Sequence, residues 1–232
     1  GEVRELVPSG NQPRYVPTGH IIYGHGDQAL MAIPFDSEAL AATGTPVTLL
    51  PSLNVFNGGA SQFAASETGT LIYDAGEAGE NISGRGSTLI EVDFQGSERP
   101  LPLSPGALDV PRYSPDGTKI AYEDGNEIRI YDVSTGASPQ LTAGGGMFPL
   151  WSKNGEYMYF QVGGPSGVSG FRRPSDGRED PVQVYDRPGQ VLIRDAATAD
   201  SILLIRENAG ETGRDLLLLR QGQDGPVFQN YL

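Results

Sequence analysis

The chain has 232 residues, of which 32 are Gly, 18 are Pro and none is Cys. The Gly share is about twice the usual value of roughly 7%, which indicates a turn-rich globular protein and disfavours a helical bundle or a charged disordered tail. The formal net charge of −13 at pH 7 disfavours nucleic acid and anionic membrane surfaces as partners, because an acidic surface repels both. The lack of Cys excludes disulfides, thiolate metal sites and cysteine nucleophiles. No apolar stretch approaches the roughly 18 residues that a transmembrane segment needs, so none is predicted in this chain.

One pattern recurs five times along the chain: an aromatic-bearing run, a turn that usually ends in Gly, and a β-rich run. The turns end at residues 19, 69, 117, 155 and 199, so the spacings are 50, 48, 38 and 44 residues, with a mean of 45. This period matches one four-stranded propeller blade and is too long for a leucine-rich repeat. The fifth copy is degenerate, because Ala199 stands at the Gly position.

The third copy shows the strands of one blade most clearly. Strands are predicted at residues 110–113, 119–122 and 127–132, with a short outer strand at 139–142. Pro115-Asp116-Gly117 between the first two strands has the residue types of a tight turn. Residues 127–132 alternate polar and apolar side chains, as in a strand with one buried face. No stretch shows an extended apolar period of 3.6, so the predicted fold class is all-β.

The five copies predict a single β-propeller domain over residues 1–232. Its four-stranded blades are expected at about 13–51, 62–104, 110–143, 148–188 and 191–232, and an additional N-terminal outer strand at 3–8. A blade alone cannot bury both faces, so neighbouring blades must stack. A five-bladed ring is favoured, and a six-bladed ring, or a fragment of one, is the alternative. The aromatic residues just before each turn are expected to pack in the core; they are Tyr15, Phe63, Tyr113 and Trp151.

Residues 111–122 read PRYSPDGTKIAY and resemble the TolB-type, WD40-like (PD40) repeat of bacterial β-propellers. Residues 19–23, 31–36 and 43–47 are similar to propeller modules appended to bacterial serine/threonine kinases, which lie outside the cytoplasmic membrane. The resemblance covers nearly the whole chain and implies a periplasmic interaction module, since these families mostly bind proteins and share no catalytic residues. The chain contains neither a kinase domain nor a membrane segment, which keeps a longer precursor as an alternative.

Three long connections carry the candidate partner-binding residues. They include residues 76–86, 163–170 and 208–214, and each joins the second and third strands of its blade, so they are expected on one rim of the ring. Loops on a rigid scaffold are common binding sites; the alternative is that these are tolerated surface insertions. The candidate residues are Glu77, Glu80, Asn81, Arg85, Ser166, Ser169, Arg172, Arg173, Glu211 and Arg214.

No catalytic, metal or cofactor site is predicted. His20 and His25 are the only histidines, and their spacing puts them on opposite faces of a strand, which favours surface or packing roles over a metal site. The run Gly24-x-Gly26-x-x-Ala29 is followed by a strand instead of a helix, which excludes a dinucleotide site. No Gly-x-Ser-x-Gly elbow occurs, and Ca²⁺ has no support because no Asp-x-Asp-x-Asp-Gly loop is present.

These observations predict a non-enzymatic, extracytoplasmic bacterial propeller that binds a protein partner, as a scaffold or as an accessory subunit of a larger assembly, which includes membrane complexes. One alternative is a glycan-binding or glycan-hydrolysing propeller whose carboxylates line the channel, although acidic turn residues mainly favour solubility. Another alternative is a sensor domain of a kinase-like receptor.

Overall fold

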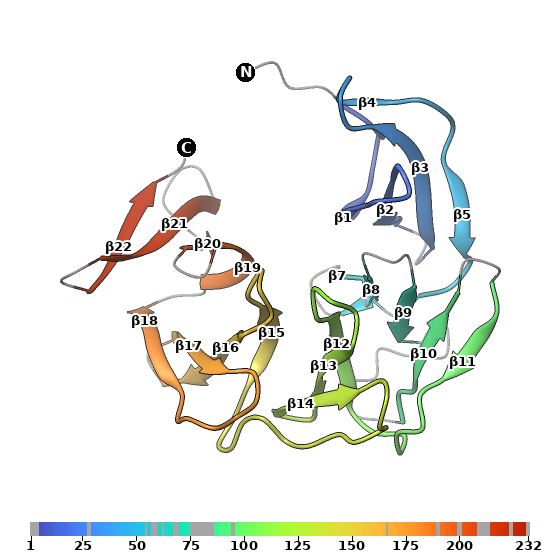
Figure 1. The fold of residues 1–232 in the computed structure, drawn as a ribbon. Coiled ribbons are helices and arrows are strands. Elements are labelled where there is room, and N and C mark those ends of the chain that lie inside the picture. Colours follow the sequence, from blue (N-terminus) through green and yellow to red (C-terminus); the bar gives the residue numbers. More distant parts are fainter. Residues whose placement is uncertain are drawn as a thin grey trace. The chain divides into compact units, whose positions relative to one another are not determined.

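The computed structural model describes residues 5–26, 29–53, 55–56, 60–61, 63–66, 70–74, 86–93, 96–165, 167–188, 191–198, 201–207, 214–222 and 225–230. Every regular element in these ranges is a β-strand, which confirms the all-β prediction (Figure 1). The chain divides into two compact units, Gly1–Pro111 and Arg112–Leu232.

The N-terminal unit holds two antiparallel sheets and a short hairpin. The strands of the first sheet are β1 (Asn11–Val16), β2 (His20–Gly24), β3 (Leu30–Asp36), β4 (Ala41–Ala42) and β5 (Val47–Leu50). They follow the order β1-β2-β3-β4, and β5 also pairs with β3. The second sheet has the order β11-β10-β9-β8, and its strands are β8 (Phe63–Ala65), β9 (Leu71–Asp74), β10 (Leu89–Val92) and β11 (Glu98–Pro100). The hairpin consists of β6 (Val55–Phe56) and β7 (Ala60–Ser61).

The third sheet matches its predicted strands closely except at its outer edge. Its strands are β12 (Leu108–Tyr113), β13 (Lys119–Asp124) and β14 (Glu127–Asp132). The predicted outer strand at 139–142 is only a bridge between Arg129 and Gln140. The Ile130 amide donates to the Pro139 carbonyl at 3.1 Å, but Pro139 has no amide hydrogen to return the bond, which limits the ladder.

The fourth and fifth sheets each have four strands in sequence order. They consist of β15 (Met147–Trp151), β16 (Tyr157–Gly164), β17 (Gly167–Pro174) and β18 (Val182–Pro188), and of β19 (Val191–Thr198), β20 (Ser201–Glu207), β21 (Arg214–Gly222) and β22 (Gly225–Asn230). The degenerate fifth copy therefore forms a complete sheet. The N-terminal strand predicted at 3–8 is wrong for its described part, because residues 5–8 are not in a strand and residues 6–9 form bends. Pro8 in this stretch lacks an amide hydrogen for a ladder.

The predicted turn chemistry is confirmed in the third and fourth sheets. In the first turn, Gly117 adopts a φ of 70° and Asp116 accepts the Thr118 amide at 3.1 Å. The Ser114 hydroxyl beside it holds the pKa of Asp116 below its usual value. In the equivalent turn Gly155 has a φ of 74°, and Asn154 accepts the Glu156 amide at 3.2 Å. Both turns thus use a side-chain acceptor followed by a Gly with positive φ.

The first strands of three sheets, β1, β12 and β15, contain a strained position that the repeat pattern did not predict. Gln12, Val110 and Phe148 have φ values of 46°, 47° and 55°, and each precedes a proline. Such a conformation costs a non-Gly residue about 1–3 kcal/mol. At one of these positions, the buried Glu123 carboxylate of β13 accepts the Phe148 amide at 2.6 Å. This bond connects β13 to the first strand of the following sheet.

Each unit has its own apolar packing. In the N-terminal unit, Val16, Ile22 and Leu30 of the first sheet pack with Phe63 and Tyr73 of the second. In the C-terminal unit, two clusters lie between the third and fourth sheets and between the fourth and fifth sheets. The expected packing role is confirmed for Phe63 and for Trp151, whose indole N–H donates to the Arg112 carbonyl at 3.0 Å. It is wrong for Tyr15, whose surface is 51% exposed.

Candidate binding cleft

Most residues of the predicted rim loops lie outside the described residues. This applies to Glu77, Glu80, Asn81, Arg85, Ser166 and Glu211. The backbone of Arg214 begins β21 opposite Glu207, and its side chain is outside the description. The role of these residues in partner binding stays a prediction.

The connection predicted at 163–170 is mostly strand instead of loop. Gly163 pairs with Val168 and Gly164 with Gly167, so only residues 165 and 166 connect β16 to β17. The antiparallel ladder continues through the small residues at the hairpin end, where Gly167 adopts a φ of 137°. A long flexible insertion is therefore not present at this position.

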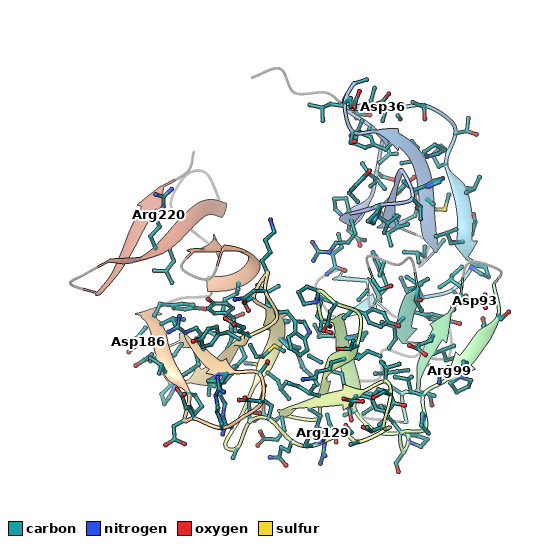
Figure 2. All side chains as sticks on the ribbon, viewed as in Figure 1. Asp36, Asp93, Arg99, Arg129, Asp186 and Arg220 are labelled. Atoms are coloured by element: carbon teal, nitrogen blue, oxygen red, sulfur yellow. The ribbon has the colours of Figure 1, made fainter. Side chains whose placement is uncertain are left out.

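The other candidate residues of this hairpin make contacts within the C-terminal unit. The Ser169 hydroxyl donates to Asp186 at 3.0 Å on the exposed surface of β17 and β18 (Figure 2). The Arg172 guanidinium lies 4.6 Å from the centre of the Tyr157 ring. Arg173 donates to the carbonyls of Glu179 and Gly177, at 2.7 Å each, and to that of Leu141. Arg173 thus holds backbone segments together, and its donors are used inside the unit.

An apolar cleft of about 340 Å³ lies within the N-terminal unit, at the junction of its two sheets. Pockets of roughly 300–1,000 Å³ are the usual size of ligand-binding sites. The apolar side chains that line the cleft come from both sheets; they are Val16, Ile22, Ala32, Val47, Leu49 and Leu50 from the first, and Ala65, Leu71 and Val92 from the second. Thr18, His20, Asp93 and Gly96 complete the lining.

The strand register explains why one sheet face supplies the lining. Ile22 pairs with Ala32, and Ala32 pairs with Val47, so these three side chains lie on the same face. Ile22 and Ala32 are buried, whereas Val47 and Leu49 on the outer strand β5 are 53% and 45% exposed. The cleft therefore has a buried apolar floor and an apolar outer wall that water reaches.

Three polar side chains lie among these apolar groups. The Nδ1 atom of His20 lies 3.0 Å from the Thr18 carbonyl oxygen and 3.2 Å from the Thr18 hydroxyl oxygen, so this ring nitrogen is engaged with Thr18. Asp93 is exposed after the end of β10, where it accepts the Ser97 amide at 2.9 Å (Figure 2). The cleft thus combines its apolar lining with an imidazole ring and a carboxylate.

Most of the negative formal charge of the chain belongs to the unit that contains the cleft. Residues 1–111 include 4 Arg, no Lys and 13 Asp or Glu, a formal charge of −9. Residues 112–232 include 12 Lys or Arg and 16 Asp or Glu, a formal charge of −4. The negative potential is therefore expected to be stronger around the cleft than around the C-terminal unit.

The described residues contain no group of three or more Asp, Glu or His side chains arranged to hold a metal ion. Within the same ranges, no helix has the length and apolar character required to cross a bilayer.

The fold is shared with solved β-propeller structures. The chain matches a TolB-type protein of Agrobacterium tumefaciens with a TM-score of 0.69 and 17% identity, over 95% of this chain and 79% of that chain. It matches TolB from Acinetobacter baumannii with a TM-score of 0.70 and 14% identity, over 94% of this chain and 53% of that chain. Dipeptidyl peptidase 4 of Porphyromonas gingivalis matches with a TM-score of 0.56 and 14% identity, over 93% and 39% of the two chains.

These matches confirm the TolB-type β-propeller fold. No protein-family model matches the sequence, and no curated protein matches it. The chain spans about half the length of the A. baumannii TolB and a smaller share of the peptidase, at the coverage values of 53% and 39%.

The sequence interpretation missed the cleft because it looked for binding residues in long loops. Two signals were present in the sequence. One is the run Val47-Thr48-Leu49-Leu50, an apolar strand between two prolines, and the other is the difference in charge between the two halves. Neither signal alone predicts that β5 lies next to the second sheet, because the position of β5 depends on how the two sheets pack.

Proposed function

We propose that this chain is a non-enzymatic, extracytoplasmic module that binds a protein partner and serves as an accessory subunit of a larger assembly. The observation that carries the proposal is the cleft of the N-terminal unit, whose apolar floor continues into the exposed side chains of Val47 and Leu49. Apolar side chains that stay exposed on a folded sheet favour a contact surface, because burying them in a complex releases water.

The fold supports the same proposal in a more general way. Rigid, mostly paired sheets can present a fixed surface with little loss of conformational entropy on binding. The TolB-type fold and the repeat resemblance at residues 111–122 support the extracytoplasmic part of the proposal. The glycan-active and receptor-sensor alternatives stay predictions.

Affinity capture in mild detergent from an extract of the source cells tests this function. The wild-type protein is compared with the double variant Val47→Ser/Leu49→Ser and with Val182→Ser, which changes an exposed apolar residue of the C-terminal unit. We expect a protein recovered in stoichiometric amount with the wild type and with Val182→Ser, and at a strongly reduced level with the double variant. Recovery of the wild-type chain alone, under conditions that preserve membrane assemblies, contradicts the proposal.

A further inference from the structure

We propose that the cleft binds a partner segment with aliphatic side chains flanked by Lys or Arg residues. This inference rests on the proposed function and specifies the chemistry of the partner.

The lining selects aliphatic groups. The floor consists of buried side chains such as Ile22, Ala32 and Leu71, and the outer wall consists of the exposed Val47 and Leu49. A volume of about 340 Å³ accommodates a few aliphatic side chains and is small for a folded element. The occupant is therefore a short segment that inserts side chains.

The outer strand disfavours binding by strand addition. β5 is the outer strand that pairs with β3, and it is only 4 residues long. Pro46 and Pro51 flank it, and prolines and short length both limit pairing with an added strand. Recognition is thus expected through side chains that enter the cleft.

The polar groups of the cleft favour hydrogen-bond donors and positive charge. His20 adds a polar ring to the lining, and its Nδ1 atom is engaged with Thr18. Asp93 adds a carboxylate, which attracts a cation. A Lys ammonium of the partner satisfies both preferences, because it donates hydrogen bonds and carries positive charge.

The formal charge of the N-terminal unit also favours a positively charged partner. Residues 1–111 carry a formal charge of −9, and one of their 4 arginines, Arg99, forms an ion pair with the buried Glu91. A partner segment with basic flanks is attracted to this surface, and an acidic segment is repelled. Charge complementarity therefore identifies the partner as basic around its apolar side chains.

Two synthetic peptides test the inference with the purified full chain. One alternates Leu and Lys, and the other has Glu in place of every Lys. We expect isothermal titration calorimetry to detect binding of the Leu–Lys peptide, with affinity that falls as salt is added, and at least about ten-fold weaker binding of the Leu–Glu peptide.

Three variants locate the binding. Val47→Ser/Leu49→Ser is expected to weaken the Leu–Lys peptide by about ten-fold or more, whereas Val182→Ser leaves it unchanged. Asp93→Asn keeps an oxygen for the Ser97 amide and removes the charge, so it should weaken the peptide about two- to five-fold and reduce the salt dependence. Circular dichroism confirms that each variant is folded.

Several outcomes overturn the inference. Equal binding of the two peptides contradicts the charge selection, and equal effects of the double variant and of Val182→Ser contradict the location. Concentration-dependent dimers that the double variant abolishes would assign the cleft to a second copy. Binding of the apolar dye Nile red, with neither peptide bound, would assign it to a small molecule. If the cell extract still yields a partner that the double variant retains, this inference fails while the general binding function stands.

Discussion

The two units use the same blade pattern, but they differ in how they expose apolar and charged groups. Among the described side chains, the large apolar residues that are exposed are Tyr15, Leu40, Val47 and Leu49 in the N-terminal unit and Val182 in the C-terminal unit. The formal charge is −9 in the first unit and −4 in the second. These differences are the features on which the proposed binding role of the N-terminal unit rests.

The C-terminal unit contains a contrasting feature, a row of residues that pack against one another across the strands of the fourth sheet. Gln161, Gly170 and Tyr185 form one row across three strands. The Tyr185 ring lies directly over Gly170, and the Gln161 amide donates to the Tyr185 hydroxyl at 2.6 Å. Burial raises the pKa of Tyr185 above its usual value. This row is a structural feature, and its disruption should change stability and leave the cleft of the other unit intact.

The largest expected effect on stability comes from Gly170→Ala. The added Cβ would lie 2.0 Å from the Tyr185 ring, so the ring must move and lose its hydrogen bond to Gln161. We expect the free energy of unfolding to fall by about 3 kcal/mol, measured by urea denaturation with Trp151 fluorescence. Gly163→Ala is the control in the same sheet, because its Cβ would meet its nearest neighbour at 3.5 Å, an ordinary contact. Equal losses for both variants would contradict the packing role of the row.

A smaller effect is expected from Glu123→Ala. The variant removes the acceptor of the Phe148 amide, a residue already strained by its φ of 55°. Loss of a buried acceptor costs about 1–3 kcal/mol. Glu123→Gln keeps an oxygen at the same place and should retain most of the stability. If Gln is as destabilising as Ala in urea denaturation, the amide bond is not the reason for the buried carboxylate.

The next prediction concerns the decrease in the free energy of unfolding of the N-terminal unit at alkaline pH. Burial, followed by the Glu98 carboxylate that accepts its hydroxyl at 3.0 Å, raises the pKa of Tyr73 to about 12, from 10.0. The folded state keeps this proton after the unfolded state has lost it, so the contribution is complete below pH 10 and is lost as the pH rises towards 12. Urea denaturation between these pH values should show a shallower decline for Tyr73→Phe. Equal declines in the wild type and in Tyr73→Phe would contradict the assignment of this pH dependence to Tyr73.

The smallest expected effect on stability is that of Val47→Ser/Leu49→Ser. Both side chains are about half exposed, with values of 53% and 45%, so the free energy of unfolding should change by less than about 1 kcal/mol. The same variant should abolish partner capture, which separates the binding surface from the folding core. A large loss of stability would instead make these residues part of the core.

The sequence predicted the fold well where turn chemistry and alternation agree. The third sheet is the best example, because Pro115-Asp116-Gly117 and the alternation of 127–132 determine its turn and its buried face. Its outer segment was overpredicted, because Pro139 interrupts the ladder. The hairpin at 163–170 was underpredicted, because glycine-rich stretches pair as strands only when a neighbouring strand is in place.

The proposed binding cleft was harder to predict from the sequence than the fold. The positive φ of Val110 and Phe148 was not predictable from the sequence, because a following proline favours an extended conformation with negative φ. The cleft needs two sheets from separate repeats, so no single repeat contains it. The charge difference between the two halves could have been read directly, and it would have directed attention to the N-terminal half.

Site-specific photo-cross-linking tests the central claim most directly. A photoreactive amino acid replaces Leu49 in one variant and Val182 in another, and both proteins are irradiated in cells that contain the native assembly. The account predicts a cross-linked partner from position 49, through a segment that carries Lys or Arg beside aliphatic residues, and none from position 182. Cross-links of equal yield at both positions, or only at position 182, would contradict the assignment of binding to the cleft of the N-terminal unit.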